Sequence, residues 1–340
     1  MKVPKARKLA SGSWFIQLRL DGQSVSVTRP TEAECIKAAE LLKAEHRNGI
    51  KKRRIAGKTL RAAIDSYIKA RDIALSPSTI RGYKCIRDTR FQAVMDMPLT
   101  SSIRWQRQIN AEAQLCSART VSNAWHFVAS VLRENGMDVP EVILPQSVSK
   151  ERPWLDPDQI GLFIDAARGD LCELAILLCL HSCRKSEVFA LTKADFDFTD
   201  ADGTIRIHSA KVLDETGHYV TKSTGKTVAA TRTIPVMIPR VRELVEMLPE
   251  DASSVAPYWP NMLYKHINAI CEKNDLPLVG VHGLRHSFAS LAYHLGWSEE
   301  MTMIVGGWDD VKTMRNIYTH IAQKDKLKAS NSMTEFYKKI

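Results

Sequence analysis

One run of residues constrains the fold more than any other part of the sequence. Residues 171–181, Leu-Cys-Glu-Leu-Ala-Ile-Leu-Leu-Cys-Leu-His, are apolar almost all the way round a helical wheel. Such a helix has no polar face to turn towards water, so it must be buried on every side. It is also only about half as long as a membrane span and carries Glu173. The run therefore predicts the central helix of a large domain.

The composition agrees with a globular protein that lies outside the membrane. Of the 340 residues, 44% are hydrophobic and 25% are charged, which excludes disordered and fibrous classes. The length allows about two to three domains. The seven Cys form no Cys-x-x-Cys pair, which argues against a disulfide framework or a zinc ribbon. No apolar segment follows the basic N-terminus, so we expect no secretory signal and a cytoplasmic location.

The positive charge is concentrated at the N-terminal end. The net charge of the chain is +10, but residues 1–58 hold 14 Lys and Arg against 5 Asp and Glu. Residues 154–340 hold 21 against 24 and are slightly acidic. The densest basic run is Lys51, Lys52, Arg53 and Arg54. It is interpreted either as a solvated linker or as a segment that contacts DNA phosphates.

The patterning divides the chain into three parts. Residues 13–28 predict a β-hairpin around Asp21-Gly22, followed by a helix that begins at Thr31 and ends at Gly49. Residues 51–58 are expected to be a linker, and four helices are expected between residues 59 and 134, closed by Asn135-Gly136. The Pro-rich stretch from residue 136 to 157 predicts a second linker.

The third part carries the apolar run and mixes helices with strands. A helix is expected from residue 156 to 167, strands over 195–198, 204–212, 218–221 and 232–236, and helices from residue 244 onwards. The predicted fold class is therefore α+β and multidomain, with a small ββα module, a helical bundle and a mainly helical domain that holds a small antiparallel sheet. The domain boundaries fall at 1–56, 57–140 and 141–340.

Four short segments of the third part carry chemistry. His282, Arg285 and His286 fall opposite a Leu and Phe stripe, so all three are expected on the exposed face of a helix N-terminus that suits a phosphate. A zinc site at His282 and His286 is the weaker interpretation, because no Glu follows the first His and no third ligand is evident. Arg184 ends the buried helix, where its charge needs a partner, and Glu187 follows three residues later.

The other two segments are less specific when each is taken alone. Lys222 and Lys226 flank Gly225 in a predicted hairpin that leads to Arg232-Thr233-Ile234-Pro235. A turn lysine is usually only solvated, although it can also donate a proton. Gly306-Gly307-Trp308 precedes Tyr318, which is a weak nucleophile unless cations lower its pKa.

Taken together and in this order, the segments resemble the tyrosine recombinases of the phage integrase family. Arg184 matches the first arginine of that family, His282 and Arg285 its His-x-x-Arg box, and Trp308 the His or Trp before the nucleophile Tyr318. Lys226 fits the hairpin lysine best, with Lys222 as the competing choice. The stretch His181-Ser182-Cys183-Arg184 departs from the family's common Thr-Gly-x-Arg, and we expect from this a small change in the turn.

The resemblance implies a mechanism without a cofactor or a metal. Tyr318 would attack a DNA phosphate to give a 3′-phosphotyrosyl link, while Arg184 and Arg285 hold the nonbridging oxygens. His282 would take the tyrosine proton, Lys226 would protonate the 5′-oxygen, and Trp308 would donate one hydrogen bond. His286 would brace the site, and Glu187 would orient its neighbours.

The resemblance also implies partners and a function. The chain would integrate or excise a mobile element, bind double-stranded DNA at core and arm sites, and act as a homo-tetramer in the nucleoid. Accessory proteins would set its direction or bend the DNA. The alternatives are a type IB topoisomerase-like relaxase, a non-catalytic DNA-binding protein on the same fold and, more remotely, a metallohydrolase. The tail from residue 327 to 340 would dock onto a neighbouring subunit or be a disordered end.

Overall fold

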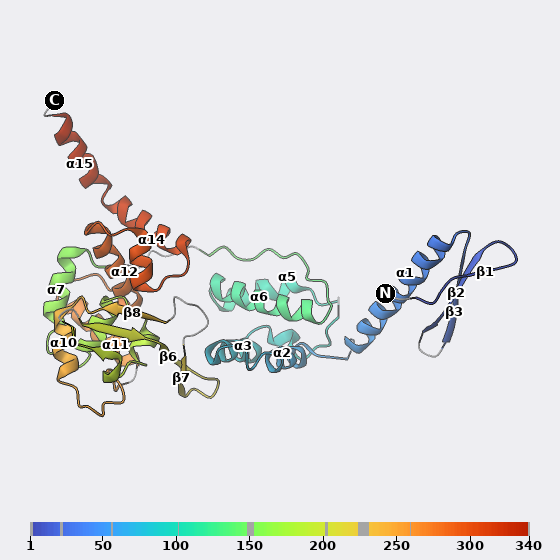
Figure 1. Ribbon diagram of the computed structural model, residues 1–340, viewed down its shortest axis with the longest axis horizontal. Helices are drawn as coiled ribbons and strands as arrows, with labels where there is room; N and C mark the ends of the chain where they lie inside the picture. The colour runs from blue at the N-terminus through green and yellow to red at the C-terminus, as the bar shows by residue number, and fades with distance from the viewer. Residues whose placement is uncertain are drawn as a thin grey trace. The chain divides into compact units, whose positions relative to one another are not determined.

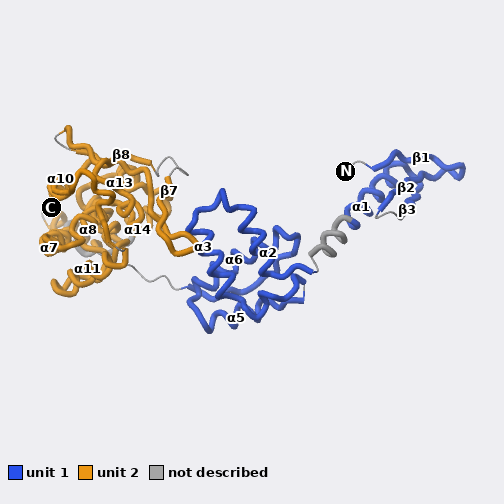
Figure 2. The backbone as a smooth tube through the Cα atoms, turned by 90° about the horizontal axis from the view of Figure 1, so that it is seen from below, with its two compact units in different colours: residues 1–148 blue, residues 149–340 orange. Residues whose placement is uncertain are grey.

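The structure of the protein is a computed structural model that describes residues 3–20, 23–55, 57–100, 102–147, 153–200, 203–223, 231–258 and 260–338. The chain, whose helices and strands are labelled in Figure 1, divides into two compact units, residues 1–148 and 149–340 (Figure 2). Unit 1 contains two separate hydrophobic clusters, and unit 2 is built around a third. The division of the chain into three domains at residues 56 and 140 stays a prediction.

The N-terminal part of unit 1 is the predicted sheet and helix. Strands β1 (Arg7–Lys8), β2 (Trp14–Leu20) and β3 (Gln23–Arg29) form an antiparallel sheet in that order. Alternate residues of β2 and β3 point to one face and are buried with the first turns of α1 (Glu32–Ile55); they are Ile16, Leu18 and Val27. The hairpin prediction is confirmed, and its turn residues Asp21 and Gly22 lie outside the described residues. The sequence prediction missed β1, which is too short to show a pattern.

Helix α1 begins where the sequence predicted but ends later. The Thr31 hydroxyl accepts a hydrogen bond from the Glu34 amide at 3.3 Å, as an N-cap does. The expected end at Gly49 is wrong, because the helix continues to Ile55. A single glycine costs a helix only about 1 kcal/mol, and the Lys and Arg residues that follow are good helix formers. Residues 51–54 are therefore helical rather than a linker, and the side chains of Lys51, Lys52, Arg53 and Arg54 lie outside the described residues.

The rest of unit 1 is a helical bundle. Its helices are α2 (Leu60–Lys69), α3 (Pro77–Thr89), α4 (Gln92–Met95), α5 (Trp105–Leu115) and α6 (Ala118–Glu134). The four predicted helices are confirmed, and α4 is an additional single turn. The Trp105 and Trp125 rings lie 5.3 Å apart in the bundle core. Helix α6 ends at Glu134, and Gly136 follows two residues later with a φ of 71°, the left-handed conformation that glycine adopts without strain.

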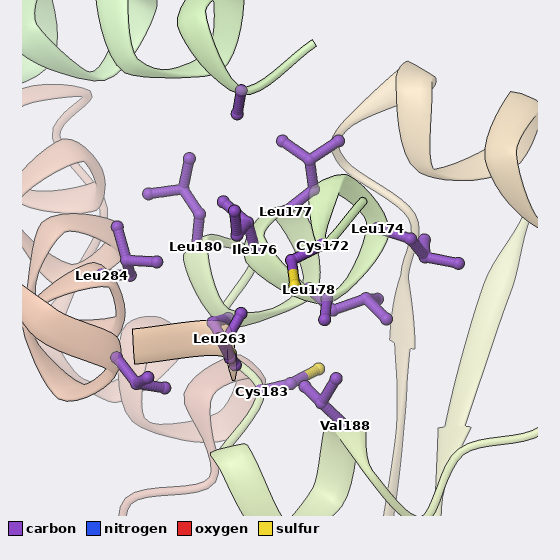
Figure 3. Packing of buried hydrophobic residues seen from close by; sticks show 14 of the residues in the cluster. Cys172, Leu174, Ile176, Leu177, Leu178, Leu180, Cys183, Val188, Leu263 and Leu284 are labelled. Carbon is purple, nitrogen blue, oxygen red and sulfur yellow. The ribbon is translucent and has the colours of Figure 1, made fainter. Parts of the chain in front are cut away.

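Unit 2 packs its helices around α8 (Glu173–Leu180), in which every residue is buried. Figure 3 shows Ile176, Leu177 and Leu180 of α8 in the core with Leu263 and Leu284. The prediction of a central buried helix is confirmed, but Leu171 precedes it and is 68% exposed. The other helices are α7 (Pro157–Ala167), α9 (Lys185–Val188), α10 (Pro239–Glu246), α11 (Pro260–Lys273), α12 (Gly280–His294), α13 (Glu299–Gly306), α14 (Val311–Lys324) and α15 (Lys326–Tyr337).

Two small antiparallel sheets complete unit 2. Strands β4 (Phe196–Asp197), β5 (Thr204–Ile207) and β8 (Arg232–Pro235) form one sheet in that order, and β6 (Ser209–Leu213) pairs with β7 (Tyr219–Ser223) in the other. The strand predicted over residues 204–212 is therefore divided at His208. A 3₁₀ turn (Lys193–Asp195) precedes β4. No helix in the described part of the chain is long and apolar enough to cross a membrane.

Candidate active site

The end of α8 positions Arg184. The Ser182 amide donates to the Cys179 carbonyl at 3.3 Å and the Cys183 amide to the Leu178 carbonyl at 3.0 Å. These two bonds form a Schellman motif, in which the residue corresponding to Ser182 takes a positive φ. The φ of Ser182 is 104°, in the region that favours glycine. This turn is where the family pattern has its glycine, so the chain keeps a positive φ there with a serine.

Replacing Ser182 with glycine is expected to stabilise the protein. Glycine would remove the strain of a side chain in this conformation, which costs about 1–2 kcal/mol, although it adds freedom to the unfolded chain. The hydrogen bond that would be lost, from the Ser182 hydroxyl to the Val305 carbonyl, is long at 3.4 Å. We expect Ser182→Gly to raise the free energy of unfolding by about 0.5–1 kcal/mol in a urea titration. Ser182→Ala, which keeps the strain, should not.

Glu187 lies between two arginines. Its side chain is only 2% exposed and accepts hydrogen bonds from Arg184 Nη1 at 2.7 Å and from Arg232 Nη1 and Nη2 at 3.1 and 3.0 Å. Burial alone would raise the pKa of Glu187, but the bonds and charges of Arg232 and Arg184 outweigh it and lower the pKa. Glu187 is therefore a carboxylate that holds both guanidinium groups in place.

Arg285 is buried in the second turn of α12. Its Nη1 donates to the Ser182 carbonyl, and its guanidinium carbon lies 3.9 Å from the centre of the Trp308 ring. Its Nη2 is buried and has no hydrogen-bond partner among the described residues. Burial and the charge of Arg184 lower the pKa of Arg285 to about 9. Arg184 and Arg232 thus share the carboxylate of Glu187, and Arg285 lies close enough for the charges of all three to act on it. An anion would complete the cluster.

This burial corrects one prediction from the sequence. Arg285 was expected on the exposed face of α12 with His282 and His286, but it is only 7% exposed. His282 is exposed and His286 is half-buried. The helical wheel placed Arg285 opposite the apolar stripe, but Ser182 in the turn after α8 and the ring of Trp308 contact Arg285 on that side of α12.

A second helix end positions Trp308. The Gly307 amide donates to the Ile304 carbonyl at 3.3 Å and the Trp308 amide to the Met303 carbonyl at 3.0 Å, with Gly307 at φ 66°. This is again a Schellman motif. A Cβ on Gly306 would lie 1.9 Å from Trp308 Cζ3, and a Cβ on Gly307 would lie 2.7 Å from Arg232 Nη1. The two glycines therefore let the tryptophan and Arg232 pack against the backbone.

Tyr318 lies in α14, and its hydroxyl is bound outside the arginine cluster. The hydroxyl is 2.6 Å from the Thr302 hydroxyl, and the ring packs edge-on against Tyr293 at 5.3 Å. The side chain is 8% exposed, and burial raises the pKa of Tyr318. Raising this pKa opposes formation of the phenolate, so in this arrangement Tyr318 is kept neutral.

Of the two hairpin lysines, the structure describes only Lys222. Lys226 lies outside the described residues. Lys222 is half-buried in β7, opposite Ala210 of β6, which is buried. Residues opposite each other in an antiparallel pair point to the same face, so Lys222 projects from the covered face of this ribbon.

The described residues contain one group that could hold a metal ion, formed by Asp170, Cys172 and His266. The Asp170 carboxylate and His266 Nδ1 of this group already bind each other. The Asp170 carboxylate lies 2.8 and 2.9 Å from His266 Nδ1 and accepts from the Cys172 amide at 2.7 Å. These bonds tie the start of α8 to α11 without an ion.

His181 makes the stability of the site depend on pH. Burial lowers its pKa to about 4, and its Nε2 accepts from the Met237 amide at 2.8 Å. The folded protein therefore favours neutral His181, whereas the unfolded chain binds the proton near pH 6.5. We expect stability to fall as the pH falls from about 6.5 towards 4, by on the order of 3 kcal/mol. Thermal unfolding of His181→Asn should show a shallower fall over the same window.

Sequence reasoning missed three residues of the site. Arg232 was used only to locate the lysine, yet it is the second buried partner of Glu187 and also donates to the Val305 carbonyl at 3.2 Å. Thr302, which binds Tyr318, lies on a different helix and gives no signal in the sequence. Ser182 could have been found from the departure of its segment from Thr-Gly-x-Arg.

Comparisons with known proteins agree with the motifs. The phage integrase family matches residues 153–325. A tyrosine recombinase XerC-like protein of Caldanaerobacter subterraneus subsp. tengcongensis is 20% identical over 285 residues, which are 72% of this chain and 73% of that protein.

Two solved structures share the fold. The Tn1549 transposon integrase in complex with a circular intermediate DNA has a TM-score of 0.61 at 15% identity, covering 77% of this chain and 95% of that one. A lambda integrase dimer bound to a COC′ core site has a TM-score of 0.52 at 15% identity, covering 93% and 94%. At these identities, the likeness establishes the fold.

The family match spans half of the chain and includes the whole arginine cluster, Trp308 and Tyr318. The fold and this match together place the protein in the class of the tyrosine site-specific recombinases. The chain belongs to the phage integrase family, so the resemblance and the α+β fold class predicted from the sequence are both confirmed. The topoisomerase-like and non-catalytic alternatives are not favoured.

Proposed function

We propose that the protein integrates or excises a mobile element by cutting and rejoining double-stranded DNA through a 3′-phosphotyrosyl link to Tyr318. The observation that carries this proposal is the unsatisfied Nη2 of buried Arg285 in a cluster of three arginines and one carboxylate. A phosphodiester supplies the missing negative charge and the acceptor oxygens. Guanidinium groups placed in this way also stabilise the charge that builds up when a phosphate is attacked.

Each side chain has a definite role in the proposed step. The Tyr318 oxygen forms a bond to phosphorus while the bond to the 5′-oxygen breaks, and Arg184 and Arg285 bind the nonbridging oxygens. His282 accepts the proton of Tyr318, and Lys226 gives a proton to the leaving 5′-oxygen. Trp308 packs beneath Arg285 and donates one bond to the phosphate. Glu187 and His286 act as positioning residues. The reverse attack by a 5′-hydroxyl restores the tyrosine and uses no other reactant.

The partners follow from the same reaction. Exchange of two duplexes requires cuts at four positions, so we propose a homo-tetramer on core sites. Residues 1–56 and the basic Lys51, Lys52, Arg53 and Arg54 would contact arm sites, and residues 57–140 would contact the core site together with residues 141–340. The relatives in complex with DNA support DNA as the partner. Accessory directionality or DNA-bending proteins and a tail that docks onto a neighbour belong to the same proposal.

The test is covalent capture on a nicked core site. Wild-type protein should give a protein–DNA adduct that survives denaturation, whereas Tyr318→Phe should give none. Adduct formation should persist in excess chelator, which would remove the metallohydrolase alternative. Absence of an adduct with wild-type protein on its own element's ends would contradict the proposal.

A second experiment decides between Lys226 and Lys222 as the general acid. A 5′-bridging sulfur leaves without a proton, so it should rescue a variant that lacks the acid. We expect Lys226→Ala to lose cleavage of normal DNA and to recover it on the sulfur substrate, and Lys222→Ala to cleave both. The opposite pattern would assign the role to Lys222, which projects from the covered face of the β6–β7 ribbon.

A further inference from the structure

We propose that Arg232 is a positioning residue for the phosphate site. It holds Glu187 and the end of α13 in place, so that Arg184 keeps both its orientation and a free positive charge for the DNA phosphate. This inference rests on the proposed function, in which Arg184 binds a nonbridging oxygen. Arg232 does not bind the DNA in this account, because each nitrogen of its guanidinium group already donates to another part of the protein.

The three arginines of the site differ in how their nitrogens are used. Arg232 donates from Nε to the Val305 carbonyl at 3.2 Å, and from Nη1 and Nη2 to the two oxygens of Glu187 at 3.1 and 3.0 Å. Arg184 uses Nη1 and Nη2, but its Nε makes no bond in the described part of the chain, and Arg285 leaves its Nη2 unpartnered there. The Arg232 side chain is 7% exposed, against 35% for Arg184. Arg184 and Arg285 therefore each offer a nitrogen to an anion, and Arg232 does not.

Arg232 and Arg184 connect the same two parts of the protein. The Glu187 carboxylate of α9 accepts the two Arg232 bonds, together with the Arg184 amide at 2.8 Å and Arg184 Nη1 at 2.7 Å. These bonds fill the acceptor positions of a carboxylate. At the C-terminal end of α13, Arg232 binds the Val305 carbonyl and Arg184 binds the Gly307 carbonyl. Loss of the Arg232 fork would therefore leave Glu187 held from one side and loosen both contacts of Arg184.

The charges explain why one carboxylate has two arginine partners. Burial raises the pKa of Glu187, and the bonds and charge of Arg232 lower it more than those of Arg184 do. Arg232 is thus the main counter-charge of Glu187. Without Arg232, the carboxylate would offset the charge of Arg184 and the pair would be neutral. With it, two arginines face one carboxylate, and one positive charge remains for the anion in addition to that of Arg285.

Misplacement of Arg184 should slow the chemical step more than it weakens DNA binding. Lysine keeps the positive charge of Arg232, but its single nitrogen cannot bind both Glu187 oxygens and the Val305 carbonyl. A shift of about 1 Å at a catalytic group can cost about a hundredfold in rate. We expect Arg232→Lys to lower the single-turnover rate of adduct formation at saturating protein by about tenfold to a hundredfold. The protein concentration that gives half of the maximal rate should stay close to the wild-type value.

The matched control is Arg240→Lys. Arg240 forms a similar fork on another buried carboxylate of unit 2, with Nε at 2.8 Å and Nη2 at 3.4 Å from the oxygens of Glu173. Arg240→Lys should also lower the urea midpoint of unfolding, but it should leave the saturated rate unchanged. A wild-type rate in Arg232→Lys, or equal slowing by the two variants, would overturn the proposal.

Nitrogen NMR of the free protein gives a second readout that needs no DNA. When both ends of a guanidinium group are bound, its two Nη groups exchange slowly and give separate signals. We expect separate Nη signals for Arg184 in wild type and in Arg240→Lys, and merged signals in Arg232→Lys. Separate signals in Arg232→Lys would contradict the positioning role alone, whereas complete absence of an adduct with wild type would contradict the proposed function.

Discussion

Arg285→Ala should reduce DNA cleavage by at least about a thousandfold, the scale expected for an arginine that stabilises a transferring phosphoryl group. Arg285 offers its free Nη2 at the centre of the cluster, and its loss would remove both the charge and the fork. Arg285→Lys should recover little, because a lysine cannot make the same pair of bonds. The measurement is the single-turnover rate of adduct formation on nicked DNA.

The matched control is Arg242→Ala. Arg242 is partly exposed and pairs with Glu246 on the same helix, so its replacement should leave the rate within about twofold. Cleavage by Arg285→Ala at the wild-type rate would show that the buried cluster is only a structural feature.

The second large effect concerns stability. Removing Glu187 would leave Arg184 and Arg232 facing each other without their shared carboxylate, and Arg232 is only 7% exposed. Loss of one partner from a buried pair typically costs about 3–5 kcal/mol, so we expect Glu187→Ala to unfold at a much lower denaturant concentration. Glu187→Gln keeps the size and some of the bonds, and it provides a foldable comparison if the alanine variant does not accumulate.

Glu243 provides the control for this second prediction. It pairs with Arg240 but is 59% exposed, and exposed pairs contribute at most about 1 kcal/mol. If Glu243→Ala and Glu187→Ala destabilised the protein equally, the burial argument for Glu187 would fail.

The sequence predicted the secondary structure best where a pattern is local. The central α8 could be predicted from its continuous apolar run, the start of α7 from its capping residue Asp156, and the β2–β3 hairpin from the alternation of its residues and its turn signal. The end of α1 could not, because one glycine weighs little against a run of good helix formers. Residues 204–212 read as one strand, although the backbone divides between two sheets at His208.

In the candidate site, too, the sequence predicted which residues take part but not how they pack together. Family motifs single out Arg184, His282, Arg285, Trp308 and Tyr318 because their order along the chain is specific. The helical wheel placed Arg285 on the surface because it considers one helix and ignores the Trp308 segment that covers it. The contacts of Tyr318 with Thr302 and Tyr293 depend on how three helices pack, and no spacing in the sequence contains that information.

The most direct test of the account is to identify the residue that carries the DNA. Wild-type protein would be trapped on nicked DNA and digested with nuclease and protease, and the modified peptide would be sequenced by mass spectrometry. We predict a nucleotide on Tyr318 and on no other residue. A nucleotide on the neighbouring Tyr293, or on any other side chain, would contradict the assignment of Tyr318 and with it the proposed mechanism.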